Sequence, residues 1–171
     1  MRLSVVIPVY NEEVCVYNVI VELIEVLRDA SFEAFEVVLV NDGSLDDTPG
    51  ILARLQREFY DCVRVVHHPY RMGVGKAIKT ALLSGRYEWL FLMPADGQCD
   101  PKDILRLTSI LDGVDIVVGW REERIDPPYR YFTSYMWRWL IGFLFGITYK
   151  DLNWVKLIRR DVVWDLELQA K

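Results

Sequence analysis

Two polar residues that could bind a metal ion follow an apolar run near the middle of the chain. Asp96 and Gln98 come after Trp89–Met93, in the sequence Pro-Ala-Asp-Gly-Gln-Cys-Asp-Pro. Five apolar residues before such a turn predict a buried strand, and open parallel sheets bind ligands at the ends of their strands. Carboxylate and carboxamide oxygens suit Mg²⁺ or Mn²⁺, which could hold phosphate oxygens of a ligand. The alternative is a turn carboxylate that caps the helix expected from Pro101.

The elements that would position these residues alternate along the chain. Short apolar runs predict buried strands, and each of the first four is followed by apolar residues at three- and four-residue spacings, as in an amphipathic helix. The expected strands are residues 3–7, 36–40, 63–67, 89–93 and 115–119. This order predicts an α/β fold with a mostly parallel central sheet and helices on both faces. A chain of 171 residues suits a single domain, residues 1–171.

Polar residues near the strand ends indicate where two helices begin. Asn11 is placed to cap the first helix, with Glu12 and Glu13 in its first turn, where the helix dipole favours anions. Asp100 is the expected N-cap of the helix after the fourth strand, and Asp103 would lie in the first turn of that helix.

Three strand ends carry polar groups that a parallel sheet would bring to one edge. They are residues 8–12, 41–44 and 96–98, and each contains a carboxylate next to a turn. Asp42 could accept hydrogen bonds from a base or a ribose. The alternative is that Asp42, like Asp47, only caps a turn or a helix.

A glycine-containing turn, Gly73–Lys76, is a weaker indication of phosphate binding. It lacks the full spacing of a phosphate loop and has no Ser or Thr after Lys76. A glycine turn that opens a helix still lets a ligand approach the backbone closely, as at Gly75. Arg71 and Lys76 are candidate donors to phosphate, and solvated surface charges are the alternative.

Composition excludes several other classes of function. A net charge of −5 argues against nucleic acid as a partner, because binding to the phosphate backbone needs a basic surface. Cys15, Cys62 and Cys99 are widely spaced and form no metal-binding pattern, which favours a reducing compartment. The N-terminal sequence does not read as a signal peptide, so we expect a cytoplasmic protein.

An aromatic segment, Tyr135–Tyr149, stands out in the C-terminal part of the chain. It is shorter than the ~20 residues that a membrane-spanning helix needs, and it contains Arg138. Dense aromatic residues around isolated arginines suit an amphipathic helix at a water–lipid interface, in peripheral contact with the membrane. The alternative is a helix packed on the sheet or against a second subunit.

Four motifs, taken together, carry a resemblance to a known family. They are Val-Val-Ile-Pro-Val-Tyr-Asn-Glu-Glu at 5–13, Val-Asn-Asp-Gly-Ser-Leu-Asp-Asp-Thr at 40–48, Arg-Met-Gly-Val-Gly-Lys-Ala at 71–77 and Ala-Asp-Gly-Gln-Cys-Asp-Pro at 95–101. In order and spacing the chain resembles glycosyltransferase family 2, with the Rossmann-like GT-A sandwich. The last motif is most similar to the branch of dolichyl-phosphate mannose synthases and polyprenyl-phosphate glycosyltransferases.

The resemblance implies a site for a nucleotide-sugar donor, such as GDP-mannose or a UDP-hexose, in residues 1–120. A divalent ion, Mg²⁺ or Mn²⁺, would be bound by Asp96 and Gln98, with Asp96 also acting in catalysis. The implied nucleotide-sugar contacts are Pro8, Tyr10, Glu12, Asp42, Gly75, Lys76 and Asp96.

The resemblance also implies an acceptor side in residues 121–171. Arg130 and Ser134 match the pair that binds the acceptor phosphate in this branch, and Arg121 ends a segment similar to Val-Gly-Ser-Arg. The phosphate of a polyprenyl lipid would attack the anomeric carbon with inversion, positioned by these three side chains. For Arg121 the alternative is a salt bridge to the adjacent acidic loop.

One position departs from the family pattern at the expected metal site. Pro94 stands where the first Asp of an Asp-x-Asp motif is expected, which removes one carboxylate. We also expect the chain to be short at its C-terminal end. Two other functions therefore stay open: a catalytically impaired GT-A domain that binds nucleotide or acts as a scaffold, and a soluble family 2 transferase with a non-lipid acceptor.

Overall fold

A computed structural model describes residues 1–120, 136, 139, 142–144, 146 and 154–165. The chain divides into two compact units, which are described separately. The first comprises Met1–Val117 and Val155–Lys171, and the second comprises Val118–Trp154.

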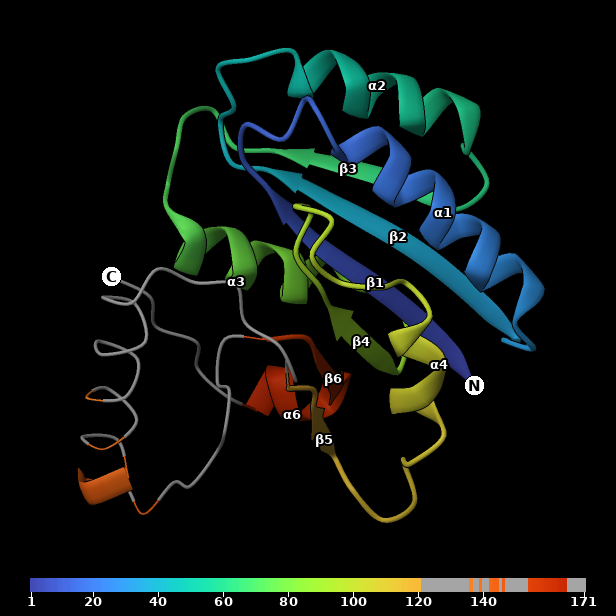
Figure 1. The fold of residues 1–171 in the computed structure, drawn as a ribbon, viewed down its shortest axis with the longest axis vertical. Coiled ribbons are helices and arrows are strands. Elements are labelled where there is room, and N and C mark those ends of the chain that lie inside the picture. Colours follow the sequence, from blue (N-terminus) through green and yellow to red (C-terminus); the bar gives the residue numbers. More distant parts are fainter. Residues whose placement is uncertain (121–135, 137–138, 140–141, 145, 147–153, 166–171) are drawn as a thin grey trace. The chain divides into compact units, whose positions relative to one another are not determined.

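A six-stranded sheet forms the centre of the fold, in the order β3-β2-β1-β4-β6-β5 (Figure 1). β1 pairs in parallel with β2 and β4, β2 pairs in parallel with β3, and β6 pairs with β4 in the antiparallel sense. The prediction of a mostly parallel sheet is confirmed, whereas β6 was not expected from the sequence. The strands are β1 Arg2–Val9, β2 Ala34–Asn41, β3 Val63–His67, β4 Trp89–Leu92, β5 Ile116–Val118 and β6 Lys156–Arg159.

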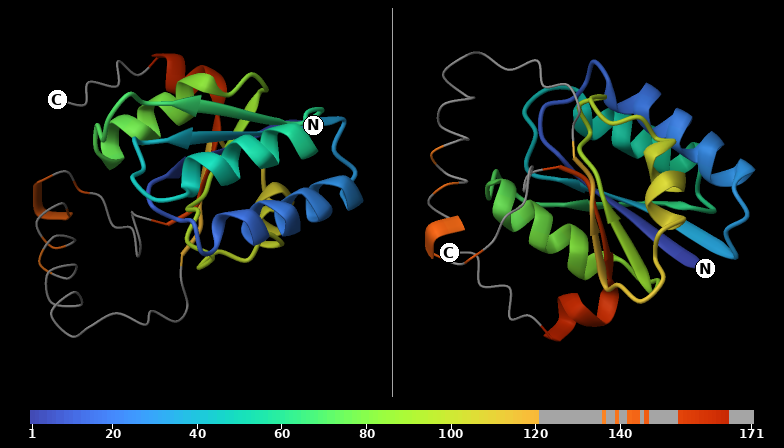
Figure 2. Two further views of the ribbon diagram at one scale, coloured as in Figure 1. Left: turned by 90° about the horizontal axis from the view of Figure 1, so that it is seen from above. Right: turned by 60° about the horizontal axis from the view of Figure 1, so that its bottom comes forward.

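Helices cover both faces of the sheet, as predicted (Figures 1 and 2). α1, α2 and α4 lie on one face, and α3 and α6 lie on the other. The helices are α1 Val16–Asp29, α2 Thr48–Glu58, α3 Val74–Ser84, α4 Asp103–Thr108 and α6 Arg160–Asp165.

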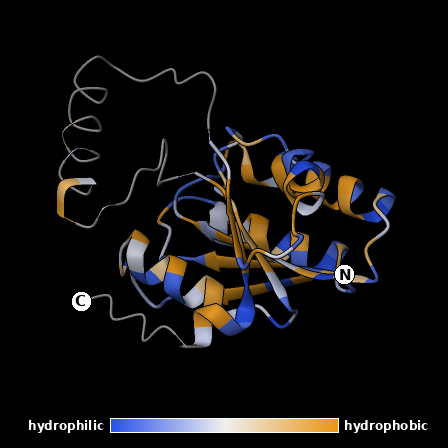
Figure 3. Cartoon of the chain, turned by 90° about the horizontal axis from the view of Figure 1, so that it is seen from below, coloured by the Kyte–Doolittle hydropathy of each residue, from blue (hydrophilic) through white to orange (hydrophobic). Residues whose placement is uncertain are grey.

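The central strands are apolar almost throughout because both of their faces are covered (Figure 3). Leu3, Val5, Val6 and Ile7 of β1 are all fully buried. Val6 packs with residues of α3 and α6, so the alternation of side chains along a strand directs Val5 toward the other helical layer. Each such side chain contributes about 1.5–3 kcal/mol on burial. This rigid sheet fixes the positions of the strand ends.

The expected start of the first helix is wrong. α1 begins at Val16, its N-cap position is Cys15, and no acidic residue lies in its first turn. Asn11 instead has a positive φ of 54°, and its side-chain oxygen accepts a hydrogen bond from the backbone N–H of Leu45. A contact distant in sequence therefore takes the side chain that local capping rules assign to the helix.

The helix after β4 also begins later than predicted. α4 starts at Asp103, with Lys102 at the N-cap position, so Asp100 is not the cap. The carboxylate of Asp100 accepts a hydrogen bond from the Lys102 N–H and stabilises a preceding turn. Asp103 does lie in the first helical turn.

The described residues contain no helix that is long and apolar enough to cross a membrane.

Gly43 allows two loops to meet at the edge of the sheet. Its φ is +67°, and a Cβ atom built there would lie 2.5 Å from the backbone nitrogen of Arg71 and collide with the carbonyl carbon of Tyr70. The segment after β2 and the segment before α3 can approach each other only if this residue has no side chain.

We expect Gly43→Ala to lower the free energy of unfolding by about 2–5 kcal/mol, since left-handed strain and a backbone collision add. Gly113→Ala is the matched control, because Gly113 has a φ of +73° but nothing within 4 Å of the added atom. It should cost only about 1–2 kcal/mol. Denaturant titration of both variants measures the difference. Equal losses would contradict the close approach at Gly43.

Candidate functional site

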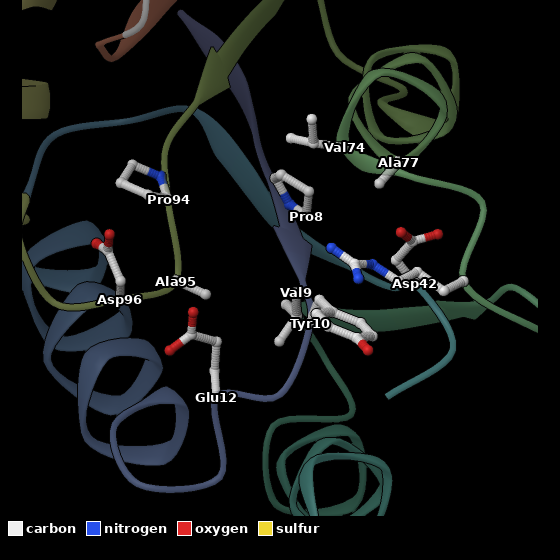
Figure 4. Close-up of a pocket in the computed structure, with 11 residues that line it drawn as sticks. Pro8, Val9, Tyr10, Glu12, Asp42, Val74, Ala77, Pro94, Ala95 and Asp96 are labelled. Carbon is white, nitrogen blue, oxygen red and sulfur yellow. The ribbon is translucent and has the colours of Figure 1, made fainter. Parts of the chain in front are cut away.

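A cavity of about 300 Å³ lies where β1, β2 and β4 end, next to the start of α3 (Figure 4). The three strand ends that the sequence singled out thus meet at one edge of the sheet. The lining residues are Pro8, Val9, Tyr10, Glu12, Asp42, Arg71, Val74, Ala77, Pro94, Ala95 and Asp96.

Asp42 holds the segment before α3 against the end of β2. The side chain is almost completely buried. One carboxylate oxygen accepts hydrogen bonds from His68 Nδ1 (2.7 Å) and the Met72 N–H (2.9 Å), and the other accepts one from the Gly73 N–H (2.9 Å). Burial by itself raises the pKa of Asp42, but these hydrogen bonds outweigh it and hold the pKa below its ordinary value. Asp42 is therefore an ionised acceptor in the cavity wall.

His68 links the Asp42 carboxylate to α3 through its two ring nitrogens. Since a carboxylate can only accept, the proton of the ring lies on Nδ1. The other ring nitrogen, Nε2, lies 2.9 Å from the hydroxyl of Thr80 in α3. The ring is thereby fixed between β2 and α3.

Tyr10 and Arg71 together cover part of the cavity wall. The guanidinium carbon of Arg71 lies 4.3 Å from the centre of the Tyr10 ring, in cation–π contact. An aromatic face beside a planar cation can stack on a base and bind a phosphate. The sequence indicated Arg71 as a hydrogen-bond donor to phosphate, but it did not predict the contact with the Tyr10 ring.

Cys15 joins the end of β1 to the segment after β4. Its thiol donates to Glu12 Oε2 (3.2 Å) and lies 3.4 Å from the carbonyl oxygen of Ala95. The pKa of Cys15 is raised to about 11. Burial is the largest cause, followed by the hydrogen bond to Glu12 and the negative charges of Glu12 and Asp96. The thiol stays protonated near neutral pH, and it brings Glu12 close to Ala95, next to Asp96 (Figure 4).

Of the two predicted metal ligands, Asp96 lines the cavity and Gln98 does not. Asp96 is exposed and accepts a hydrogen bond from the backbone N–H of Gln98 at 3.0 Å. Within the residues that the structure describes, no three His, Cys, Asp or Glu side chains form a group that could hold a metal ion. Pro94 lines the cavity without offering a ligand. The oxygen donors suit a hard cation if a bound diphosphate completes its coordination.

Gly75 and Lys76 lie in the first turn of α3. Neither lines the cavity directly, but Val74 and Ala77 of the same turn do. The N-terminus of a helix attracts anions, because its first N–H groups have no partner within the helix. This turn could therefore act on a ligand through its backbone.

The predicted acceptor residues Arg121, Arg130 and Ser134 lie outside the described residues. In the second unit, Met136, Trp139 and 142–144 of the aromatic segment are helical, whereas Gly146, which is also described, is not. The rings of Trp139 and Phe143 stack with centroids 5.6 Å apart. Both side chains are exposed.

Proteins of known activity resemble the chain over most of its length. A dodecaprenyl-phosphate galacturonate synthase of Rhizobium johnstonii is 29% identical, over all of this chain and 52% of the relative. An undecaprenyl-phosphate 4-deoxy-4-formamido-L-arabinose transferase of Pseudomonas aeruginosa is 32% identical, over 94% of this chain and 48% of the relative. The chain thus spans about half the length of these relatives.

Solved structures share the fold. Glucosyl-3-phosphoglycerate synthase from Mycobacterium tuberculosis, crystallised with Mn²⁺, UDP-glucose and phosphoglyceric acid, superposes with a TM-score of 0.72 at 22% identity, over 94% of this chain and 57% of that one. A mannosyltransferase from Pyrobaculum calidifontis, in complex with GDP-mannose and Mn²⁺, gives a TM-score of 0.63 at 21% identity, over 97% and 46%. At these identities the likeness shows the fold, which is the GT-A fold.

A family model described as "Glycosyl transferase family 2" matches residues 4–162. The matched region contains the described strands, apart from the first two residues of β1, and the residues named above as lining the cavity. The chain belongs to glycosyl transferase family 2.

Proposed function

We propose that the chain binds a nucleotide-diphosphate sugar in the cavity and transfers the sugar to a polyprenyl phosphate, with inversion at the anomeric carbon. The observation that carries the proposal is the meeting of Tyr10, Asp42 and Asp96, from three strand ends, around one cavity. An aromatic ring, a buried acceptor and an exposed carboxylate together suit the base, ribose and diphosphate of such a donor.

The donor would lie along the ends of the central strands. Tyr10 and Arg71 would contact the base or a phosphate, and Asp42 would accept a hydrogen bond from the base or ribose. Asp96 and Gln98 would bind Mg²⁺ or Mn²⁺ on the diphosphate side, where such an ion neutralises charge on the leaving group. Two structural neighbours crystallised with Mn²⁺ and a nucleotide sugar support this assignment.

The acceptor assignment rests on the named relatives, which act on dodecaprenyl and undecaprenyl phosphates. Arg121, Arg130 and Ser134 would hold the acceptor phosphate, and arginine suits this role because its planar guanidinium binds phosphate bidentately. A phosphate monoester already carries negative charge near neutral pH, so positioning contributes more than removal of a proton.

Contact with a membrane surface would bring the enzyme to such an acceptor. The aromatic segment carries exposed Trp139, Phe143 and Leu144, which are suited to the interface between water and lipid. We therefore propose peripheral association with the cytoplasmic face of the membrane.

Two observations each support a different function, and both functions can be tested. The Mycobacterium tuberculosis neighbour was crystallised with phosphoglyceric acid, a non-lipid compound, which supports a soluble transferase as the second candidate. Pro94, in the cavity wall, removes a carboxylate and supports a catalytically impaired nucleotide-binding domain as the third.

Isothermal titration of UDP and GDP, with and without Mn²⁺, tests the donor site. We expect one nucleotide to bind more tightly when Mn²⁺ is present. Asp96→Asn should weaken this metal-dependent binding at least about tenfold, since even residues that only support a metal ligand contribute about 10–100-fold to metal affinity.

Asp112→Asn is the control for that titration. It removes the same charge from an exposed position that does not line the cavity, so it should bind nucleotide as the unmodified chain does. Binding that is absent, or equal with and without the metal ion, would rule out a metal-dependent donor site.

Co-sedimentation with liposomes that contain anionic lipid tests the membrane contact. We expect the unmodified chain to pellet with lipid and Trp137→Ala/Trp139→Ala to stay in the supernatant, because aromatic side chains anchor at the interface. Trp164→Ala, which removes an exposed tryptophan from α6, is the matched control and should still pellet. The membrane proposal should be dropped if the unmodified chain does not pellet.

A further inference from the structure

Three consecutive backbone N–H groups in the segment after β1 are bound by side chains from the β2–α2 loop and from the first residue of α2. This is unusual for a loop, because each donor is satisfied by a residue more than thirty positions away. The hydrogen bonds are Asn11 N to Ser44 Oγ (3.0 Å), Glu12 N to Thr48 Oγ1 (2.9 Å) and Glu13 N to Asp46 Oδ2 (3.2 Å).

The same two segments also bind in the opposite direction. The Leu45 N–H donates to Asn11 Oδ1 (2.9 Å), and the Asp47 N–H donates to Glu13 Oε2 (2.8 Å). We call this set of five hydrogen bonds, between residues 11–13 and 44–48, the loop clasp.

The polar residues of the second segment are bound mainly to the first segment, although Asp46 Oδ1 also accepts a hydrogen bond from the N–H of Thr48, the first residue of α2 (3.1 Å). The N-cap residue, Asp47, makes no side-chain capping hydrogen bond. Thr48 is fully buried, and its hydroxyl accepts from Glu12 instead. Asn11 adopts a left-handed φ of 54°, a conformation that costs about 1–2 kcal/mol and that the clasp offsets. These contacts therefore act between the loops.

The loop clasp includes one residue of the cavity wall, Glu12, and is next in sequence to another, Tyr10. Tyr10 and Glu12 line the cavity on either side of Asn11, and Asp42 precedes the second segment by two residues. Fixing the backbone of residues 11–13 against residues 44–48 thus fixes Tyr10 and Glu12 relative to Asp42. Small displacements of such groups have large effects on binding and rate.

We propose that the loop clasp positions Tyr10 and Glu12 for the donor nucleotide, with Thr48 as its central positioning residue. The inference rests on the proposed donor site. It assigns a role to Asn11, Ser44, Asp46 and Thr48 that involves no contact with the ligand.

Replacement of the Thr48 hydroxyl tests this role. Thr48→Val keeps the shape of the side chain but removes the acceptor of the Glu12 N–H, whereas Thr48→Ser keeps the hydroxyl. We expect Thr48→Val to raise the Kd for UDP or GDP, in the presence of Mn²⁺, by about tenfold. Thr48→Ser should bind the nucleotide with the Kd of the unmodified chain. Asn11→Gly allows the same backbone angle without the side-chain acceptor, and it should weaken binding in the same direction.

Tyr17→Phe is the control for a general loss of stability. It removes a hydroxyl of α1 that donates to Glu58 (2.8 Å) and accepts from Arg54 (3.1 Å), both in α2 and outside the loop clasp. We expect it to lower Tm without changing the Kd for the nucleotide.

Two results would overturn the inference, and they are distinguishable. If Thr48→Val and Asn11→Gly lower Tm but bind nucleotide as the unmodified chain does, the loop clasp has a structural role alone. If the unmodified chain binds neither UDP nor GDP, the proposed donor site is wrong and the inference fails with it.

Discussion

The site depends on the hydrogen bonds that the carboxylate of Asp42 accepts. Its three hydrogen bonds hold the segment that precedes α3 against the end of β2, with Gly43 allowing the backbones to meet. Arg71 belongs to that segment, so the contact between Arg71 and the Tyr10 ring follows from the same interaction. A carboxylate that is ionised, buried and held by three hydrogen bonds is rigid as well as negatively charged, and rigid groups lose little entropy on binding a ligand.

The strands and the convergence of their ends could be predicted from the sequence, because continuous apolar runs and turn residues are local signals. β6 could not, since Lys156–Arg159 gains its strand partner from β4, more than sixty positions earlier. The same reason explains the error at Asn11, where the distant Leu45 N–H competes with helix capping. Local rules describe elements well, but they fail where a side chain has a better partner in another loop.

Pro94 shapes what the cavity can do with a metal ion. It lines the cavity without offering a carboxylate, and the acidic side chain that lies near Asp96, Glu12, comes from the segment that follows β1. Cys15 hydrogen-bonds to Glu12, and its pKa is raised by burial first, then by this hydrogen bond and by the negative charges of Glu12 and Asp96. A divalent cation held by Asp96 in the proposed donor site would reduce this negative charge.

The most direct test of the account is a transfer assay with a polyprenyl phosphate acceptor and a panel of nucleotide sugars, in the presence of Mn²⁺. The account predicts a lipid-linked sugar from at least one donor, and loss of this product in Asp96→Asn. Binding of nucleotide without transfer from any donor would contradict it and would favour a nucleotide-binding domain that does not catalyse transfer.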